Sequence, residues 1–195
     1  MNLQQPLTEE TFTQGLKELA NRDKDFAEVI NKWGNPPRRE EEAGFSGLVR
    51  TILGQQVSVG SASATMKRLC ETVAPLTPDN LLKFEDAQLK ACGISRQKTT
   101  YIKELAMAIV NNDLDLDKLA VADEETIRNQ LKPIKGIGDW TIDIYLLMCL
   151  QRADAFPKSD LGVILAYQKL KKLEKRPTPE ELEIIAENWR PWRAI

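Results

Sequence analysis

The chain has 195 residues, of which 42% are hydrophobic and 29% are charged, and these ordinary proportions exclude wholesale disorder. Its 27 basic and 29 acidic residues give a net charge of −2, so no global field attracts the protein to nucleic acid, and any contact with DNA must be local. The sequence contains no histidine, which excludes His-dependent catalytic triads and the common zinc sites.

Apolar residues recur three and four positions apart nearly throughout the chain, as at Phe12, Leu16 and Leu19, and there is no convincing alternating strand. This pattern predicts an all-α fold. The length predicts one compact domain, 1–195, with two helical lobes and a cleft between them. We expect about ten to twelve short helices, roughly at 8–20, 24–33, 45–55, 60–73, 78–91, 95–111, 123–131, 139–150, 160–172 and 179–189.

Two helix starts carry specific signals. Thr77-Pro78 and Thr178-Pro179 each place a capping hydroxyl before a proline at the first helical position, and Glu181 completes a capping box in the second case. The turn residues 34–37 and the charged run 38–42 predict a solvated connector. We therefore divide the domain into N-terminal helices and connector, approximately 1–42, and a helical body, 43–195.

The cysteines and the apolar stretches bear on the cellular location. Cys70, Cys92 and Cys149 are an odd number and lie far apart, so we expect core thiols rather than disulfides. The longest apolar stretches, such as 144–150, are too short to span a bilayer, and the first residues do not resemble a signal peptide. We expect a cytoplasmic protein without membrane contact, nucleoid-associated if bacterial and nuclear if eukaryotic.

The most informative segment is 131–141, where one helix ends, a Gly-x-Gly turn follows and an apolar helix begins. It predicts a helix-hairpin-helix. Gly136 and Gly138 allow positive φ and close approach, so backbone N–H groups and the next helix N-terminus can point at one phosphate. Taken alone, such a turn is more often only a helix C-cap than a phosphate-binding site. Lys132 and Lys135 add little support for phosphate binding, because lysines beside turns are common.

Asp160 stands at the start of a predicted helix whose capping hydroxyl could be that of Ser159. The helix dipole and the free N–H groups favour a carboxylate there, which suits a residue that faces developing positive charge or orients a water molecule. By itself this position is more often a simple helix cap.

Four motifs in order resemble the helix-hairpin-helix (HhH-GPD) DNA glycosylase superfamily, and within it the DNA-3-methyladenine glycosylase II family. The resemblance covers roughly residues 40–193, and the end, Trp189-Arg-Pro-Trp-Arg193, also fits. The motifs are Leu48-Val-Arg-Thr-Ile-Leu-Gly-Gln-Gln-Val-Ser58, Gly93-Ile-Ser-Arg-Gln-Lys-Thr-Thr-Tyr-Ile102, Gly136-Ile-Gly-Asp-Trp-Thr141 and Phe156-Pro-Lys-Ser-Asp-Leu-Gly162.

The resemblance implies a monofunctional DNA glycosylase of base excision repair, which flips alkylated, 3-methyladenine-type purines out of duplex DNA and hydrolyses the N-glycosidic bond. It makes Asp160 the catalytic carboxylate. It assigns Trp140, Gln55 and Tyr101 to the pocket for the flipped base. Without the family, Trp140 could equally be a core aromatic.

The resemblance also implies a set of DNA-binding residues. Gln56 matches the position that fills the gap left by the extruded nucleotide. The hairpin backbone is the phosphate anchor, and a monovalent cation, Na⁺ or K⁺, can be held around Gly136 and Gly138; no other cofactor is expected. The remaining DNA contacts are Lys135, Ile137, Thr141 and Ser58. Gln55, Gln56 and Ser58 could otherwise be mere helix-end amides and hydroxyls.

Departures from the family refine this expectation. The superfamily's strand-cleaving members carry a lysine where Trp140 stands, so a Schiff-base lyase step lacks its nucleophile. An iron–sulfur cluster would need four closely spaced cysteines. Ile144 stands where relatives can carry an aromatic residue, and the chain stops at Arg193-Ala-Ile, where relatives commonly continue; both differences bear on base preference.

Two other functions stay open. Helix-hairpin-helix units also serve as non-enzymatic DNA-binding modules, in which Asp160 would be only a cap. The acidic pI of 5.4 is compatible with a generic helical interaction protein. The Ser95-Arg-Gln-Lys98 segment matches an S-x-x-K acyl-transfer pattern but lacks its partner motifs. Damaged double-stranded DNA is the expected partner, and we expect a monomer.

Overall fold

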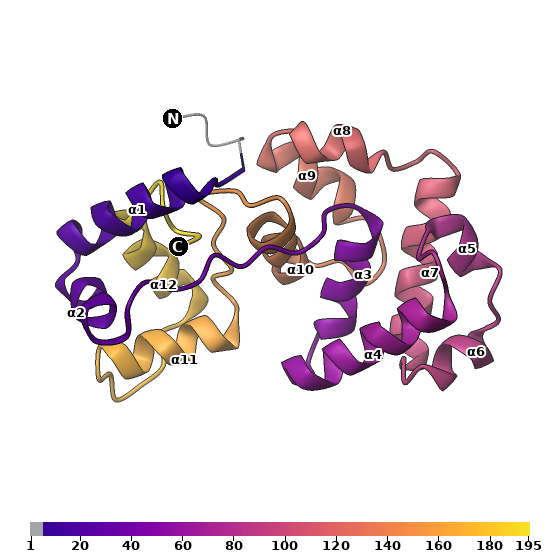
Figure 1. The fold of residues 1–195 in the computed structure, drawn as a ribbon, viewed down its shortest axis with the longest axis horizontal. Coiled ribbons are helices and arrows are strands. Elements are labelled where there is room, and N and C mark those ends of the chain that lie inside the picture. The colour runs from indigo at the N-terminus through magenta and orange to yellow at the C-terminus, as the bar shows by residue number, and fades with distance from the viewer. Residues whose placement is uncertain (1–5) are drawn as a thin grey trace. The chain divides into compact units, whose positions relative to one another are not determined.

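The computed structural model describes residues 6–195, and the regular secondary structure in this range is helical (Figure 1). The only β pairing among these residues is an isolated bridge between Pro6 and Arg152. The all-α prediction is therefore confirmed. The described helices are α1 (Glu9–Arg22), α2 (Lys24–Trp33), α3 (Phe45–Gly54), α4 (Val59–Thr72), α5 (Pro78–Leu82), α6 (Asp86–Ala91), α7 (Arg96–Val110), α8 (Leu116–Val121), α9 (Glu124–Leu131), α10 (Asp139–Ile144), the π-helix η1 (Tyr145–Cys149), α11 (Leu161–Leu170), α12 (Pro179–Ala186) and the 3-10 helix η2 (Glu187–Trp189).

Local signals set most helix starts. The Thr77 hydroxyl accepts a hydrogen bond from Asn80 N, with Pro78 in the first turn of α5. Thr178 and Glu181 form the predicted capping box of α12. The predicted helix 78–91 is interrupted, because Glu85 begins α6 with a capping box of its own, in which its backbone N–H donates to Gln88.

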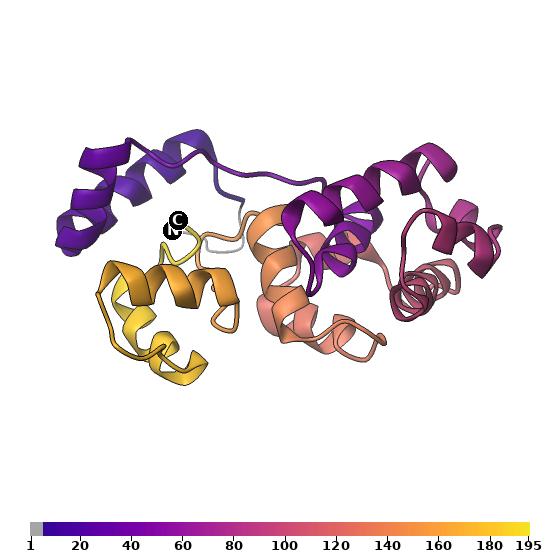
Figure 2. The ribbon, with the colours of Figure 1, turned by 90° about the horizontal axis from the view of Figure 1, so that it is seen from below.

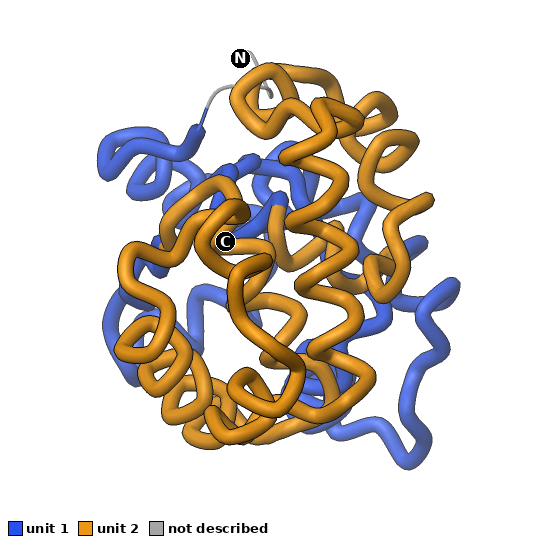
Figure 3. Tube along the Cα trace, turned by 90° about the vertical axis from the view of Figure 1, so that its right-hand side faces the viewer, with its two compact units in different colours: residues 1–40, 146–195 blue, residues 41–145 orange. Residues whose placement is uncertain are grey.

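The chain forms two compact units, coloured in Figure 3: unit 1 comprises residues 1–40 and 146–195, and unit 2 comprises residues 41–145. The first boundary lies close to the predicted one at about residue 42. The second boundary was not predicted from the sequence. The N-terminal helices thus share a unit with the C-terminal quarter of the chain, whereas the sequence division placed that quarter with the helical body.

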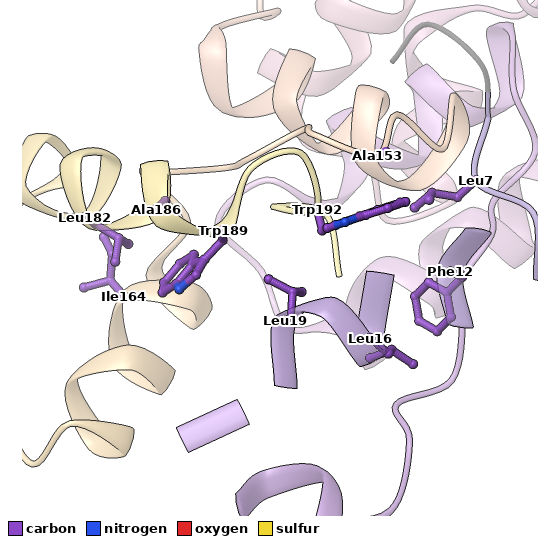
Figure 4. Close-up of a cluster of buried hydrophobic side chains, with 10 residues drawn as sticks. All are labelled: Leu7, Phe12, Leu16, Leu19, Ala153, Ile164, Leu182, Ala186, Trp189 and Trp192. Atoms are coloured by element: carbon purple, nitrogen blue, oxygen red, sulfur yellow. The ribbon is translucent and has the colours of Figure 1, made fainter. Parts of the chain in front are cut away.

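Unit 1 has an aromatic and aliphatic core, drawn in Figure 4. α11 and α12 lie side by side in Figures 1 and 2, and Ile164 of α11 belongs to the same buried cluster as Leu182 of α12. The indole N–H of Trp192 donates to Glu18 of α1 at 2.7 Å. Burial of this cluster joins the two ends of the chain. Its members are Leu7, Phe12, Leu16, Leu19, Ala153, Ile164, Leu182, Ala186, Trp189 and Trp192.

Unit 2 is built around α3, which packs against α4, α7 and α10. Leu48, Val49 and Ile52 of α3 are completely buried. A helix buried on most of its surface has a fixed axis, so the loop that leaves its C-terminus begins from a defined point. This loop, residues 55–58, carries three of the predicted site residues, Gln55, Gln56 and Ser58.

The thiols and the membrane prediction can be compared with the structure. Cys92 and Cys149 are buried free thiols, as expected, whereas Cys70 is exposed on α4, so the expectation of a core position was wrong for it. None of the helices that the structure describes is both long enough and apolar enough to cross a bilayer.

Candidate functional site

The hairpin between α9 and α10 has the predicted turn. Ile134 N donates to the carbonyl of Leu131, and Ile137 N donates to that of Ile134, both at 3.0 Å. Gly136 has φ +89°, a conformation that L residues with a side chain rarely adopt. Gly138 is different, because it has an extended φ of −103° and needs no positive φ. Gly138 instead leaves open space beside the backbone, since a Cβ there would meet no atom within 4 Å.

Tyr101 of α7 gives a second reason for glycine at position 136. A Cβ built on Gly136 would lie 2.1 Å from Cγ of the Tyr101 ring, so the ring packs directly on the hairpin backbone. Gln97, one turn earlier on α7, donates its amide N–H to the Tyr101 hydroxyl. The phenol thus supports the hairpin from one side, whatever part it takes in a base pocket.

Gln55 joins the loop after α3 to the same hairpin. Its side-chain amide donates to the carbonyl of Gly136 at 2.8 Å and to the Thr141 hydroxyl at 2.9 Å. Both amide hydrogens are therefore used, and Thr141 is itself 2% exposed. The predicted roles of Gln55 in base binding and of Thr141 in DNA binding stay predictions, and the structure adds a positioning role for both residues.

Lys98 completes this set of contacts. Its ammonium donates to the carbonyls of Leu53 and Gln55 at 2.7 and 2.8 Å, which are orphan acceptors at the C-terminal end of α3. Burial lowers the pKa of Lys98. The Ser95 hydroxyl caps α7 by accepting from Lys98 N, so both residues of the S-x-x-K pattern have structural hydrogen bonds.

After Gln55, the loop between α3 and α4 presents its side chains to solvent. Gln56 is exposed and has φ +54°, an uncommon conformation for a residue with a side chain. Ser58 caps α4 by accepting from Ser61 N at 3.2 Å. Val57 and Val59 are 45% and 81% exposed. Three other described residues with side chains share a positive φ, so this conformation does not by itself mark a binding site.

Most predicted residues of unit 2 line one cavity of about 610 Å³. The loop, the start of α7 and the hairpin form its walls. Gln55, Gln56, Tyr101, Lys135, Gly136, Ile137 and Gly138 all contribute to this lining, together with Val57, Ser95, Gln97, Lys98, Lys132, Pro133 and Ile134. Trp140, Thr141 and Ser58 are outside it. Trp140 is half-buried as the second residue of α10.

A buried ion pair ties the two helices of the hairpin together. Arg128 of α9 donates to Asp143 of α10, whose side chain is only 4% exposed, and to Glu124 at 2.7 Å. Lys132 adds a bond to Asp139 at 2.9 Å. Burial raises the pKa of Asp143, and the hydrogen bond from Arg128 acts against this effect. The ionised form of the buried Asp143 carboxylate is therefore stabilised by Arg128.

Replacing Arg128 with methionine should lower the free energy of unfolding by roughly 3 kcal/mol at pH 8, because a buried carboxylate loses its partner. Without Arg128, burial raises the folded-state pKa of Asp143 further above its ordinary value of 3.8. The native state then binds more protons than the unfolded state, so stability falls as the pH rises through that folded pKa. Urea unfolding of R128M should therefore show a smaller loss at pH 5 than at pH 8.

The double variant R128M/D143N provides the control for this prediction. It contains no buried charge at the pair, so its stability should lose the extra pH dependence. A loss in R128M that is equal at both pH values would contradict the electrostatic explanation.

Asp160 lies in unit 1, where it is the N-cap of α11. Its carboxylate accepts from Val163 N at 3.0 Å, so Asp160 itself caps the helix, and the expected cap by Ser159 was wrong. Gly162 leaves room for the carboxylate, because a Cβ there would lie 2.9 Å from Asp160 Oδ1. Asp160 is partly exposed, as a residue that meets a substrate must be.

Sequence reasoning missed the roles of several residues near the hairpin. Lys98 was present in a quoted motif, but the two carbonyls that it binds are 43 and 45 residues away in the chain. Arg128 and Asp143 carry no motif at all. A pair of opposite charges on helices that flank a predicted hairpin was the only signal available for them.

The family model of the HhH-GPD superfamily of base excision DNA repair proteins matches residues 49–191. The chain belongs to this superfamily. The match covers the α3 loop, the hairpin and Asp160 together, which is the combination that the sequence motifs indicated.

The chain is also similar in sequence to proteins named DNA-3-methyladenine glycosylases. DNA-3-methyladenine glycosylase of Saccharomyces cerevisiae is 33% identical over 135 residues, which are 64% of this chain and 46% of that protein. DNA-3-methyladenine glycosylase 1 of Schizosaccharomyces pombe is 28% identical over 176 residues, which are 86% of this chain and 77% of that protein. The chain thus spans less than half of the first relative and most of the second.

The fold is shared with solved HhH-GPD structures. The 3-methyladenine DNA glycosylase of Schizosaccharomyces pombe, solved in complex with abasic DNA, superposes with a TM-score of 0.83 at 26% identity, covering 92% of this chain and 91% of that one. DNA-3-methyladenine glycosidase of Bacillus halodurans gives a TM-score of 0.77 at 26% identity, covering 93% and 84%.

Proposed function

We propose that the protein is a DNA glycosylase of base excision repair that removes alkylated, 3-methyladenine-type purines from damaged double-stranded DNA. The single observation that carries this proposal is the occurrence, in one HhH-GPD chain, of the braced hairpin and of a partly exposed carboxylate at the N-terminus of α11. The names of its relatives support the substrate class.

The chemistry fits these residues. A purine alkylated at N3 or N7 carries a positive charge, so it leaves with the electron pair of the N-glycosidic bond and needs little acid assistance. The sugar becomes oxocarbenium-like, and water then adds at C1′ and loses a proton. We infer that Asp160 stabilises the positive charge on the sugar, which is an electrostatic role for a fixed carboxylate. Trp140 would stack on the cationic base, which an aromatic face favours over a neutral one.

Unit 2 would hold the DNA. The hairpin N–H groups around Gly136 and Gly138 bind a phosphate, Lys135 adds charge, and Gln56 fills the space of the extruded nucleotide. Extruding the nucleotide costs a few kcal/mol of lost base stacking. The loop that carries Gln56 therefore has to be held in a fixed position. Gln55 and Lys98 supply that support through their hydrogen bonds to the carbonyls of Gly136, Leu53 and Gln55.

A monovalent cation at the hairpin is part of the proposal. The described residues contain no cluster of three or more acidic, cysteine or histidine side chains that could hold a metal ion. The carbonyls around Gly136 and Gly138 each keep a second lone pair beside the hydrogen bond they accept, and such neutral oxygens suit Na⁺ or K⁺. When bound, the ion would link the hairpin to a phosphate.

We infer further that the enzyme has no lyase activity. Trp140 occupies the second position after Gly138, where a Schiff-base reaction would need an amine. A monomer is sufficient for this chemistry, because every proposed group belongs to one chain. We propose a location with the cellular DNA, in the cytoplasm of a bacterium or the nucleus of a eukaryote.

Base release from a panel of duplexes tests the proposal. We expect release of methylated purines from DNA treated with dimethyl sulfate, little release of hypoxanthine or ethenoadenine, and strand breaks only after alkali. Strand breaks without alkali would contradict the absence of lyase activity. Release of a neutral lesion in preference to the cationic purines would contradict the proposed selectivity.

A non-enzymatic DNA-binding module is the second candidate, and the capping hydrogen bond that Val163 N donates to the Asp160 carboxylate favours it, because this bond alone accounts for an aspartate at that position. Binding to abasic-site duplexes without base release from any lesion would support the module. The two candidates therefore give opposite results in the same assay.

A further inference from the structure

A cluster of positive charge follows the C-terminal end of α11. Residues 169–176, here called the basic turn, contain five cationic side chains and one acidic one, Glu174, in a protein whose net charge is −2. The cationic residues are Lys169, Lys171, Lys172, Lys175 and Arg176. Nothing in the function proposed above uses them.

The basic turn is held in place by contacts within unit 1. Lys171 donates to Asp25 and lies 3.5 Å from Asp23, and the hydrogen bond to Asp25 raises the pKa of Lys171. Gln168 closes the end of α11, because its carbonyl accepts from Leu173 N at 3.0 Å and its side-chain amide donates to the carbonyl of Leu173 at 3.2 Å. Lys171 thus fixes the turn on α2.

The other four cations are exposed, and none of them has an ion-pair partner among the described carboxylates. Some lysines of the protein are paired, as Lys103 is with Asp86 and Lys158 with Glu183, but the basic turn places four exposed cations without such a pair within eight residues. The helix dipole accounts for cations in the last turn of a helix, but its effect falls off beyond that turn. Lys175 and Arg176 lie five and six residues after the end of α11, so the dipole does not account for them.

The same helix carries Asp160 at its other end. α11 has 10 residues, which corresponds to a length of roughly 15 Å at about 1.5 Å per residue. Phosphates of one strand advance roughly 3.4 Å along the duplex axis per nucleotide. When α11 runs along the duplex with Asp160 at the sugar of the extruded nucleotide, the basic turn is therefore within reach of phosphates roughly four nucleotides away.

We propose that Lys169, Lys172, Lys175 and Arg176 form a second DNA-backbone contact, which binds phosphates flanking the lesion without reading their sequence. This inference rests on the proposed function. The turn holds the four charges close together before DNA arrives, so binding costs less ordering of the chain than it would for a mobile tail. The contact would anchor unit 1 to the duplex, whereas the hairpin anchors unit 2.

A charge-neutralised variant tests the proposal. We would compare K169Q/K172Q/K175Q/R176Q with K17Q/K67Q/K83Q/K118Q, which loses the same charge at exposed positions elsewhere in the chain. The measurement is affinity for an abasic-site duplex, with ten base pairs on each side of the site, across a salt series. We expect the basic-turn variant to bind at least tenfold more weakly and its log–log salt slope to fall by about 2 to 4, at about 0.9 per lost phosphate contact.

Duplex length provides the second readout. A shorter duplex that ends three base pairs from the abasic site on each side lacks the flanking phosphates. The wild-type protein should therefore bind this short duplex more weakly than the long one, whereas the affinity of the basic-turn variant should be nearly the same for both. Equal slopes and affinities for the two quadruple variants would overturn the proposal. So would an effect of the basic-turn variant confined to vesicles of phosphatidylglycerol, which would assign the turn to an anionic lipid surface.

Failure of this inference is distinguishable from failure of the proposed function. If wild type releases methylated purines and the basic-turn variant binds DNA like its control, the function stands and the second contact is wrong. If wild type neither binds abasic-site DNA nor releases a base, the function itself is wrong and the second contact falls with it.

Discussion

Replacing Asp160 with asparagine should abolish most base excision while leaving the protein folded and able to bind damaged DNA. Asparagine is as good an N-cap as aspartate, so the hydrogen bond from Val163 N is retained and α11 keeps its start. The negative charge, however, is lost. Removing one group that stabilises transition-state charge costs at least about a hundredfold in rate, and single-turnover release of methylated purines measures this loss.

Asp123 offers a matched control for this substitution. It is the N-cap of α9 and accepts from Thr126 N at 2.8 Å, so D123N makes the same chemical change at the same position of another helix. Its excision rate should equal that of wild type. A D160N rate that matches D123N would leave Asp160 with the role of a helix cap and would favour the non-enzymatic module.

Replacing Gly136 with alanine should damage the hairpin and, through it, binding to every DNA sequence. The positive φ and the contact with the Tyr101 ring act together, because the new methyl group would be strained in its backbone and would overlap the ring. A strained backbone and an overpacked side chain each cost about 1–3 kcal/mol, so we expect the free energy of unfolding to fall by roughly 3 kcal/mol. Thermal unfolding and a duplex-binding titration measure the two effects.

Gly138 separates the two causes of such a loss. A methyl group there meets no protein atom and fits the observed φ, so G138A should unfold at the temperature of wild type. The same methyl group stands where the phosphate would approach, so duplex affinity should fall about equally for all sequences. Unchanged affinity in folded G138A would contradict the phosphate-binding role of the hairpin.

The two substitutions examine different units. D160N tests a charge in unit 1 that acts on the reacting sugar, and G136A tests a backbone shape in unit 2 that holds the strand. A glycosylase requires both. Loss of excision with retained binding in the first variant, and loss of binding in the second, would separate chemistry from DNA recognition within one chain.

Local rules accounted for most of the helices. Thr77, Thr178 and Ser95 cap helices with partners three residues away, so the signal and its effect lie within one turn of the chain. The interruption at Glu85 was missed because a glutamate cap competes poorly with a continuous apolar pattern. The π-helix at 145–149 was missed because it shares the hydrophobic spacing of the α-helix that it extends.

The candidate site was only partly predictable. Its motifs placed Gln55, Tyr101 and Gly136 among the functional residues, but not the contacts among them. The Gln55 amide reaches a carbonyl 81 residues away in the chain, and the Tyr101 ring excludes a side chain from Gly136. Such contacts depend on how α3, α7 and the hairpin pack, and no local spacing specifies that packing.

The amino-acid sequence by itself determined the helical class, the superfamily, the hairpin and the position of Asp160, because each depends on residues close together in the chain. Only the tertiary structure decided that 1–40 joins 146–195 in one unit, that Lys98 supports the Gln56 loop, and that Lys171 holds the basic turn on α2. Lys171 and Asp25 are 146 residues apart. Their contact exists because burial of the unit 1 core brings the two ends of the chain together, which no pattern of neighbouring residues records.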